Sequence, residues 1–246
     1  MSAIRVTAAR TIGRSRHQLL TAFALGGFLA VSALFFAFGL ESAEGGELSV
    51  SVIWATSVSY VLPALAAILS MEVWSEERLT GRIDILLTLA IRERDFVLGK
   101  FFGVLAQMVF AIALSLLLSV SALAIQAPQA LVGIGLGAFL LATTALVLQS
   151  ALWCAIGVAL SAMFRHSATV ICSTLLLTVV LPRGVWFGLR AWSPLGRTSF
   201  GEFPLDAHVI DIASGMVPLG TVVAYALSAV MVLFIASKFV ACYRFS

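Results

Sequence analysis

Long apolar runs alternate with short polar segments along the whole chain. Six of these runs contain no Asp, Glu, Lys or Arg, and the charged residues lie almost entirely in the gaps between them. The runs cover Gln18–Leu40, Leu48–Met71, Phe101–Ile125, Gly133–Phe164, Ser167–Pro182 and Met216–Ser237. A helix needs about 20 mostly apolar residues to cross a bilayer. The pattern therefore predicts six membrane-spanning helices. The fifth run is the shortest and reaches full length only if it continues to Phe187.

The composition supports a membrane protein. Hydrophobic residues make up 61% of the chain and charged residues 11%, and the mean hydropathy is +1.08. A soluble domain carries about 25% charged residues. We therefore expect an all-α polytopic membrane protein, surrounded by a lipid bilayer and folded as a single domain over residues 1–246.

Basic residues are distributed unevenly between the two sides of the predicted membrane. Twelve of the 15 Lys and Arg fall on one side: Arg5, Arg10, Arg14, Arg16, Arg78, Arg82, Arg92, Arg94, Lys100, Arg165, Lys238 and Arg244. Only Arg183, Arg190 and Arg197 fall on the other. The positive-inside rule then predicts that both termini are cytoplasmic. Because the cations have this topological explanation, we expect no nucleic-acid partner.

Four tryptophans lie near predicted span ends, which is typical of an interfacial aromatic belt. They are Trp54, Trp74, Trp186 and Trp192.

The sequence lacks the common signatures of catalysis and metal binding. It contains no phosphate-binding loop, H-E-x-x-H, C-x-x-C or G-x-S-x-G motif. No acid or base lies deep in a predicted span, where membrane enzymes and proton-coupled carriers usually need one. Gln107 and Gln149 are the largest polar groups there, and we expect them to form hydrogen bonds between helices. We predict no catalytic residue, no metal site and no cofactor held by this chain.

The gap Glu72–Lys100 is long for a connection between neighbouring membrane helices. Within it, Leu79, Ile83, Leu86 and Leu87 recur at helical spacing. Gly81 breaks the run, and Thr80 can cap a helix that starts after it. Two interpretations stay open from the residues alone: an interfacial loop anchored by leucines, or a docking helix for a cytoplasmic partner.

The same gap resembles a motif of ABC-2 type permeases. The stretch from Glu77 to Thr88, followed by Gly99-Lys100-Phe101, is similar to E-R-x-x-G-T-x-E-x-L-L-T…G-K-F, and most similar to the gliding-motility and nitrous-oxide-reductase-accessory branch. The segment Pro204–Gly215, which contains His208, resembles the segment before span six in that branch.

The chain departs from the motif at three positions. Arg82 and Asp84 stand where the family has Thr and Glu, and Ala90 stands where Pro is common. These departures suit docking to a particular ATPase.

The resemblance implies a fold and partners. It implies a type V exporter-like ABC-2 permease with six spans, paired with a second permease protomer in a homo- or heterodimer. Each protomer would dock an ATP-binding subunit that holds ATP and Mg²⁺, and an auxiliary envelope protein could join the assembly. The location would be a bacterial inner membrane.

The resemblance also assigns roles to segments and residues. Residues 2–17 would form an amphipathic elbow and residues 72–100 a cytoplasmic coupling loop. The ATPase-docking residues would be Glu76, Glu77, Arg78, Thr80, Gly81, Arg82, Asp84, Leu86 and Leu87. Residues 183–215 would form an external re-entrant or interfacial segment, since they mix tryptophans with arginines and prolines.

Span one would form a wall between protomers, and it is rich in phenylalanine. We expect Phe23, Phe28, Phe35, Phe36 and Phe38 to line this interface or the pathway, although lipid-facing aromatics would give the same pattern. Without a charge at the midplane, the pathway suits a lipid-linked, amphipathic or apolar cargo.

The leading hypothesis is a permease subunit driven by a separate ATPase. The alternatives are a membrane anchor of a motility or secretion machine, and an intramembrane lipid-modifying enzyme.

Overall fold

The computed structural model describes residues 5, 7–9, 19–42, 49–71, 73–74, 93–126, 136–164, 166–185 and 204–244. Its helices are α2 (Leu19–Ser42), α3 (Val50–Ser70), α6 (Glu93–Gln126), α8 (Leu136–Met163), α9 (Ser167–Leu175), the π-helical turn η1 (Leu176–Val180), α12 (Pro204–Ala213) and α13 (Leu219–Arg244). Within these ranges there is no β-strand.

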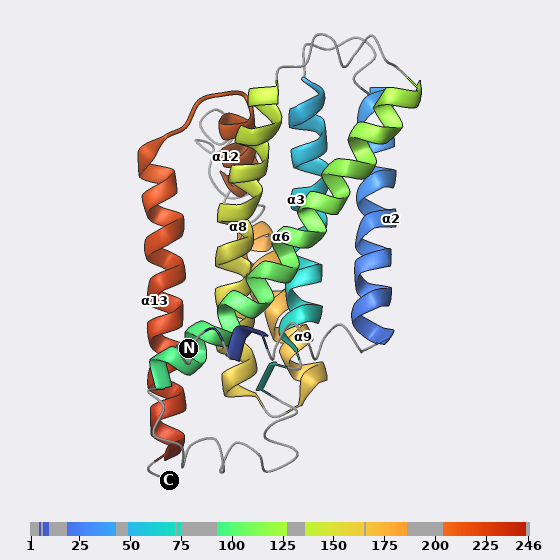
Figure 1. Cartoon of the computed structure of the whole chain (residues 1–246). Coiled ribbons are helices and arrows are strands. Elements are labelled where there is room, and N and C mark those ends of the chain that lie inside the picture. Colours follow the sequence, from blue (N-terminus) through green and yellow to red (C-terminus); the bar gives the residue numbers. More distant parts are fainter. Residues whose placement is uncertain are drawn as a thin grey trace.

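Among the described residues, six helices are long and apolar enough to cross a membrane, as the sequence predicts. They cover Thr21–Ser42, Val50–Ser70, Arg94–Ile125, Gly137–Met163, Ser167–Val185 and Leu219–Cys242. They run alternately up and down, so α2 begins at the end of the bundle where α13 finishes (Figure 1). We call this the charged end, because Arg94, Asp95 and Lys238 lie near it; the other is the opposite end.

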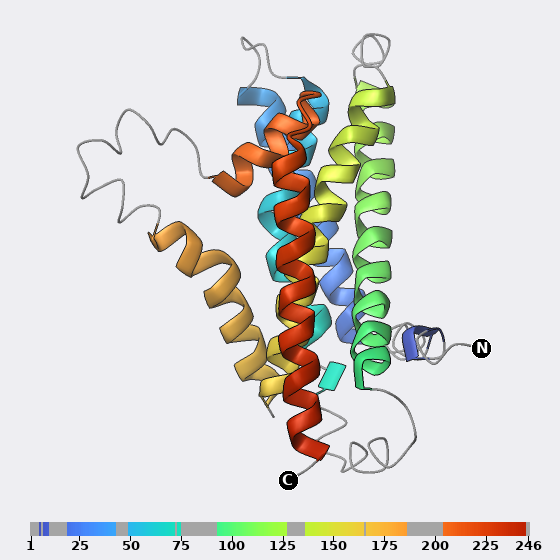
Figure 2. The same ribbon diagram turned by 90° about the vertical axis from the view of Figure 1, so that its left-hand side faces the viewer.

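The fifth span reaches full length because its helix continues beyond the apolar run to Val185. It is formed by α9, η1 and one further turn. Figure 2 shows that this span leans away from the other helices and ends well below the opposite end of the bundle. Its last residues therefore lie at the depth of the middle of its neighbours.

The helix of the third span begins earlier than predicted, inside the Glu72–Lys100 gap. Helix α6 begins at Glu93, so the last residues of the predicted loop are helical and continuous with the span. The helix extends past the apolar run because charged residues such as Arg94 and Asp95 are compatible with helix outside a bilayer.

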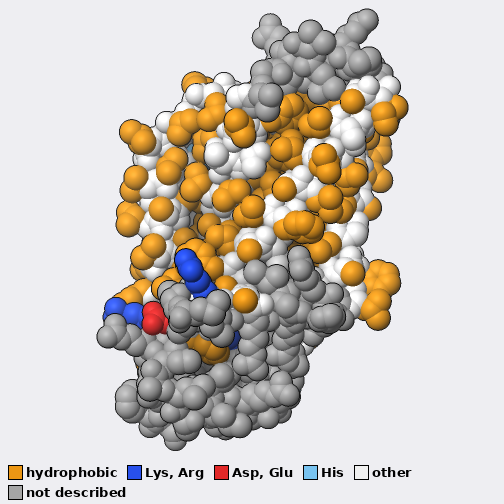
Figure 3. Space-filling view, viewed as in Figure 1, with side chains coloured by type: hydrophobic (Ala, Val, Ile, Leu, Met, Phe, Trp, Pro, Cys, Tyr) orange, Lys and Arg blue, Asp and Glu red, His pale blue; other side chains and the backbone are white. Residues whose placement is uncertain are grey.

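The outer surface of the bundle is mainly apolar. Where side chains are coloured, the face in Figure 3 is mainly hydrophobic, and the charged side chains drawn there gather towards its lower part. Large apolar side chains such as Phe23, Phe110 and Leu227 are mostly exposed. A surface of this kind belongs in lipid, and the protein is a multi-pass membrane protein.

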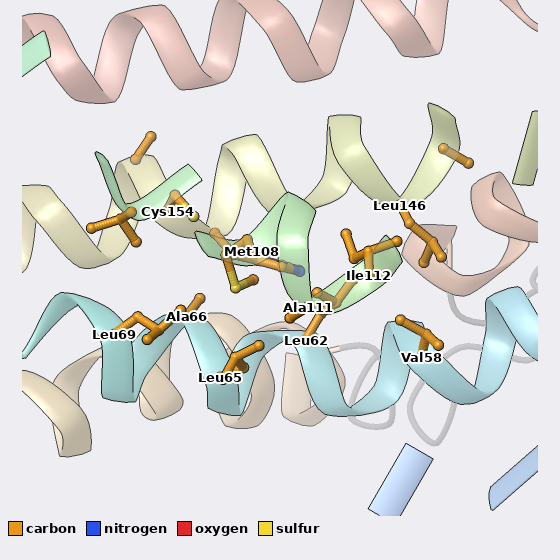
Figure 4. Packing of buried hydrophobic residues seen from close by; sticks show 14 of the residues in the cluster. Val58, Leu62, Leu65, Ala66, Leu69, Met108, Ala111, Ile112, Leu146 and Cys154 are labelled. Carbon is orange, nitrogen blue, oxygen red and sulfur yellow. The ribbon is translucent and has the colours of Figure 1, made fainter. Parts of the chain in front are cut away.

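Helix α3 forms the centre of the bundle. It packs against α2, α6, α8, α9 and α12. Figure 4 shows Val58, Leu62 and Leu65 of α3 facing Met108 and Ile112 of α6, with α8 alongside. Because lipid solvates apolar groups well, close packing and interhelical hydrogen bonds hold these helices together.

Gly157 and Gly39 permit close approaches to α3. A Cβ at Gly157 of α8 would overlap the hydroxyl of Ser70, and it would lie 3.5 Å from the Ala66 carbonyl oxygen. A Cβ at Gly39 of α2 would lie 2.5 Å from Cγ2 of Ile53. Small residues at these points let the helix backbones come together.

Polar groups inside the bundle bond between helices. The Ser59 hydroxyl donates to Oε1 of Gln149 at 2.9 Å, which joins α3 to α8 and confirms the prediction for Gln149. Trp54 Nε1 donates to Oγ of Ser115 at 3.4 Å. Trp54 and Trp74 are fully buried, so assigning them to an interfacial belt was wrong; their rings fill the core. Trp186 and Trp192 lie outside the described residues.

Helix α12 is a short element near the opposite end, packed against α3 and α8 (Figure 1). Its inner face buries Val209 and Ile212. The helix ends in a Schellman motif: the N–H of Met216 donates to the Asp211 carbonyl, and the N–H of Gly215 to the Ile212 carbonyl. Gly215 has a φ of 100°, which favours glycine and explains its place in the Pro204–Gly215 motif.

Two predicted segments are described only in part. Of the elbow at 2–17, Arg5 and residues 7–9 are helical and the rest lies outside the described residues. Of the external segment 183–215, residues 183–185 end the fifth span and 204–213 form α12, while 186–203 lie outside.

Candidate functional site

The predicted ATPase-docking residues all lie outside the described residues. They are Glu76, Glu77, Arg78, Thr80, Gly81, Arg82, Asp84, Leu86 and Leu87. The structure does describe the two ends of their segment, at Trp74 and at Glu93. These ends reveal how the segment is attached to the spans.

Lys100 of α6 is buried at the charged end, with 2% of its surface exposed. Its Nζ donates a hydrogen bond to the backbone carbonyl of Val73. It also lies 4.0 Å from the centroid of the Trp74 ring and 4.8 Å from that of Phe96. A carbonyl and two aromatic faces compensate for removing an ammonium group from water. Sequence reasoning counted Lys100 among the orienting cations and placed it in the G-K-F motif, but it did not predict this contact with Val73 and Trp74.

Trp74 also connects this region to α8. Its backbone N–H donates to Oγ of Ser161 in α8 at 3.2 Å. Its fully buried ring packs edge-on against Phe96, with 5.1 Å between centroids. We call Val73, Trp74, Phe96, Lys100 and Ser161 the anchor. It joins the residues just after α3 to α6 and α8.

The predicted phenylalanine wall of span one is divided between two faces. Phe28 and Phe36 are buried inside the bundle, so they do not lie on its outer surface, and their predicted role in the pathway or interface stays a prediction. Phe23, Phe35 and Phe38 are exposed and remain candidates for a surface contact. All sides of α2 are apolar, and periodicity therefore could not predict which phenylalanines face inward.

A cavity of about 400 Å³ lies between α2 and α6. Phe36 and Leu29 line it, together with the hydroxyl-bearing Ser32, Ser115 and Ser119. Glu41 lies at its edge, near the end of α2. The cavity combines apolar walls with a few polar groups, a composition typical of small-molecule sites.

A second groove, of about 410 Å³, lies between α2 and α3 and is closed on one side by Ile210 of α12. It runs from Ser42, at the end of α2, to Tyr60. Phe35 and Phe38 form its apolar wall, and Phe35 lies 6.2 Å from the Tyr60 ring, centroid to centroid. We call it the α2–α3 groove.

A guanidinium group lies beside the inner end of this groove. Cζ of Arg183, in the fifth span, is 5.1 Å from the centroid of the Tyr60 ring. Tyr60 is the middle residue of α3, ten residues from either end, or about 15 Å along the helix. Arg183, which the sequence places in the external gap, therefore lies beside the middle of α3. The cause is the leaning of the fifth span, which ends at mid-depth (Figure 2).

No curated protein matches the chain. A family model does match, over residues 5–191, and it describes an ABC-2 family transporter protein.

Proposed function

Because the chain belongs to the ABC-2 family of transporter proteins, we propose that it is a membrane permease subunit driven by a separate ATP-binding subunit. That subunit would hold ATP and Mg²⁺ and dock on residues 76–87. Two permease protomers, identical or different, would complete the complex. The charged end would be cytoplasmic, in a bacterial inner membrane.

The proposal rests on the anchor. The proposed docking segment lies directly after Trp74, and the anchor ties Val73 and Trp74 to α6 and α8. Closure of two ATP-binding subunits would displace the docking segment. A rigid attachment would then pass this displacement to α3, α6 and α8, which allows the bundle to switch between two arrangements.

The finer family assignment is also a proposal. The Glu77–Thr88 motif supports the gliding-motility and nitrous-oxide-accessory branch, in which an auxiliary envelope protein would be expected. A purely mechanical anchor would need no cargo site. The cavity between α2 and α6 and the α2–α3 groove favour transport over that alternative.

Docking can be tested with the cognate ATP-binding subunit purified together with the full chain. The chain alone should hydrolyse no ATP, and the complex should. Combined Glu76→Lys, Glu77→Lys and Arg82→Glu should release the subunit while the chain stays folded. If the subunit remains at full stoichiometry, docking on this segment is wrong.

A second variant separates docking from coupling. Lys100→Met removes the charge from the anchor and keeps a side chain of similar length. The ATP-binding subunit should stay bound, but ATP should no longer change the accessibility of single cysteines placed along α6. Arg94→Gln is the matched control, because Arg94 is exposed on the same helix. An unchanged ATP response in Lys100→Met would remove the anchor from the mechanism.

A further inference from the structure

We propose that the cavity between α2 and α6 binds an amphiphilic cation, whose ammonium group lies against Glu41, whose carbonyl oxygen accepts from Ser119, and whose apolar chain fills the rest of the cavity. This names a cargo class and therefore rests on the proposed transport function. Three features carry it: two hydroxyl groups that need an acceptor, an acidic residue at the cavity's edge, and an apolar wall that opens onto the surface of the bundle.

Ser115 and Ser119 are the first feature. They lie one turn apart on α6, and both are buried and line the cavity. A serine hydroxyl within a helix usually donates to a carbonyl three or four residues earlier, as that of Ser121 does to Leu118. Among the described residues, Ser119 has no hydrogen-bond partner, and Ser115 only accepts, from Nε1 of Trp54. A buried hydroxyl without an acceptor is unfavourable, so both favour a ligand that brings one.

Glu41 sets the charge of the site. It lies at the edge of the cavity, near the end of α2, and is exposed. No other described residue of the lining is acidic or basic. With a carboxylate and no cation among these residues, the cavity's edge attracts an ammonium group and repels a phosphate or a carboxylate. Charge complementarity therefore selects a cationic head group.

The apolar wall is the third feature. Large apolar residues of both helices form it: Leu29, Phe36, Leu40, Leu118 and Leu123. On α2 the lining extends from Leu29 to Glu41, about 18 Å along the helix, which suits an extended acyl chain. Ala33, Ala37 and Ala122 also line the cavity and are exposed, so it opens onto the surface of the bundle. An amphiphile can therefore enter sideways from the lipid.

The order of these groups determines how the ligand lies. Both helices run from the charged end to the opposite end (Figure 1), so Glu41 and Leu123 lie at the outer end of the cavity. Ser119 lies about one turn further in than Leu123, and Ser115 about two turns. The ligand therefore needs a cation at one end, a hydrogen-bond acceptor next to it and an apolar chain beyond.

Binding of lauroylcholine to the full chain in phosphatidylcholine nanodiscs tests the site. This probe combines a trimethylammonium group, an ester carbonyl and an acyl chain. Two analogues each lack one feature: neohexyl laurate has carbon in place of the charged nitrogen, and pentadecyltrimethylammonium has no ester. After subtraction of binding to empty nanodiscs, the wild type should bind lauroylcholine about threefold more tightly than either analogue.

Each variant should remove the advantage of one feature. Glu41→Gln should abolish the preference over neohexyl laurate, and Ser119→Ala the preference over pentadecyltrimethylammonium. Ala37→Phe should fill the cavity and weaken binding of all three probes. Matched controls, which change a similar residue outside the cavity lining, should bind as the wild type does: Asp211→Asn, Ser121→Ala and Ala30→Phe.

Equal binding of the three probes by the wild type would overturn the proposal and leave only an apolar cavity. An unchanged preference for lauroylcholine in Glu41→Gln or in Ser119→Ala would also overturn it, as would full binding in Ala37→Phe. If a variant does not fold, the three probes on the wild type still decide. Added salt should then weaken the preference for the cation, because Glu41 is exposed. The assay needs no ATP-binding subunit, so its failure is distinct from a failure of docking.

Discussion

Spans two and five of this protein differ in almost every physical respect. In span two, α3, 72% of the most apolar stretch is buried, whereas in span five the share is 17%. Span two is hydrogen-bonded to its neighbours through side chains, with Ser59 bonded to α8 and Trp54 to α6. Span five leans outward, contains a π-helical turn and carries Arg183 near its end.

This difference separates two tasks. A helix enclosed on all sides contributes packing contacts and holds the fold, and a substitution there is felt by several neighbours. A helix that is mostly exposed contributes little to stability and can change its position at low cost. We therefore expect stability to be concentrated in span two, and a change of position to cost least in span five.

The largest loss of stability should come from Trp54→Ala. The ring is fully buried, packs edge-on against Phe139 at 6.0 Å between centroids, and bonds to Ser115. We expect a loss of about 3 kcal/mol, the low end for a buried aromatic, because lipid also solvates apolar groups in the unfolded state. Reversible unfolding in mixed micelles measures it. Trp54→Phe should lose less, and a loss below about 1 kcal/mol in Trp54→Ala would contradict a central role for span two.

Gly157→Leu should have the next largest effect. Any side chain at this position meets Ser70 and the Ala66 carbonyl, so α8 must move away from α3. Overpacking of this kind costs about 2 kcal/mol. The matched control is Gly137→Leu on the same helix, where an added Cβ meets nothing within 4 Å. Equal unfolding free energies for the two variants would show that the α3–α8 contact is looser than the structure indicates.

Ser59→Ala, which also changes span two, should lower the unfolding free energy by a smaller amount. It removes the hydrogen bond to Gln149, and such bonds within membranes contribute about 0.6 kcal/mol on average. Ser121→Ala is the control, because that exposed hydroxyl bonds to its own helix, at the Leu118 carbonyl. A double variant with Gln149→Leu would measure the coupling between the two side chains. Zero coupling energy would argue against this bond as an interhelical link.

The sequence was sufficient for the part of the fold that depends on length and hydropathy. The six spans lie close to their predicted places, because a bilayer demands about 20 apolar residues whatever the neighbouring helices are. The hydrogen bonding of Gln149 could also be predicted, because an amide inside a span must find a partner. The family match over residues 5–191 agrees with the predicted permease family.

The sequence could not predict which way a side chain faces or how a helix leans. Phe28 and Phe23 belong to one uniformly apolar helix, and only tertiary packing buries the first and exposes the second. In the sequence, Lys100 resembles an ordinary cation at the end of a span, and only the structure shows its contacts with Val73 and Trp74. Arg183 follows an apolar run, and the sequence places it outside the membrane, but the lean of span five brings it beside Tyr60 at the middle of α3. The docking residues 76–87 stay a prediction.

The smallest effect should come from Leu181→Ala in span five, and it tests the comparison most directly. Leu181 is half-exposed, whereas Leu62 at the centre of α3 is fully buried. Leu62→Ala deletes the same atoms and should cost about 2 kcal/mol. Leu181→Ala should change the unfolding free energy by less than about 0.5 kcal/mol, since lipid replaces the lost contacts. Both variants should be unfolded as a dilute monomer and at high protein concentration. A large loss for Leu181→Ala only at high concentration would mean that a second protomer covers span five, and that Arg183 lies at a protomer interface. A large loss in the dilute monomer would contradict the division of tasks between the two spans.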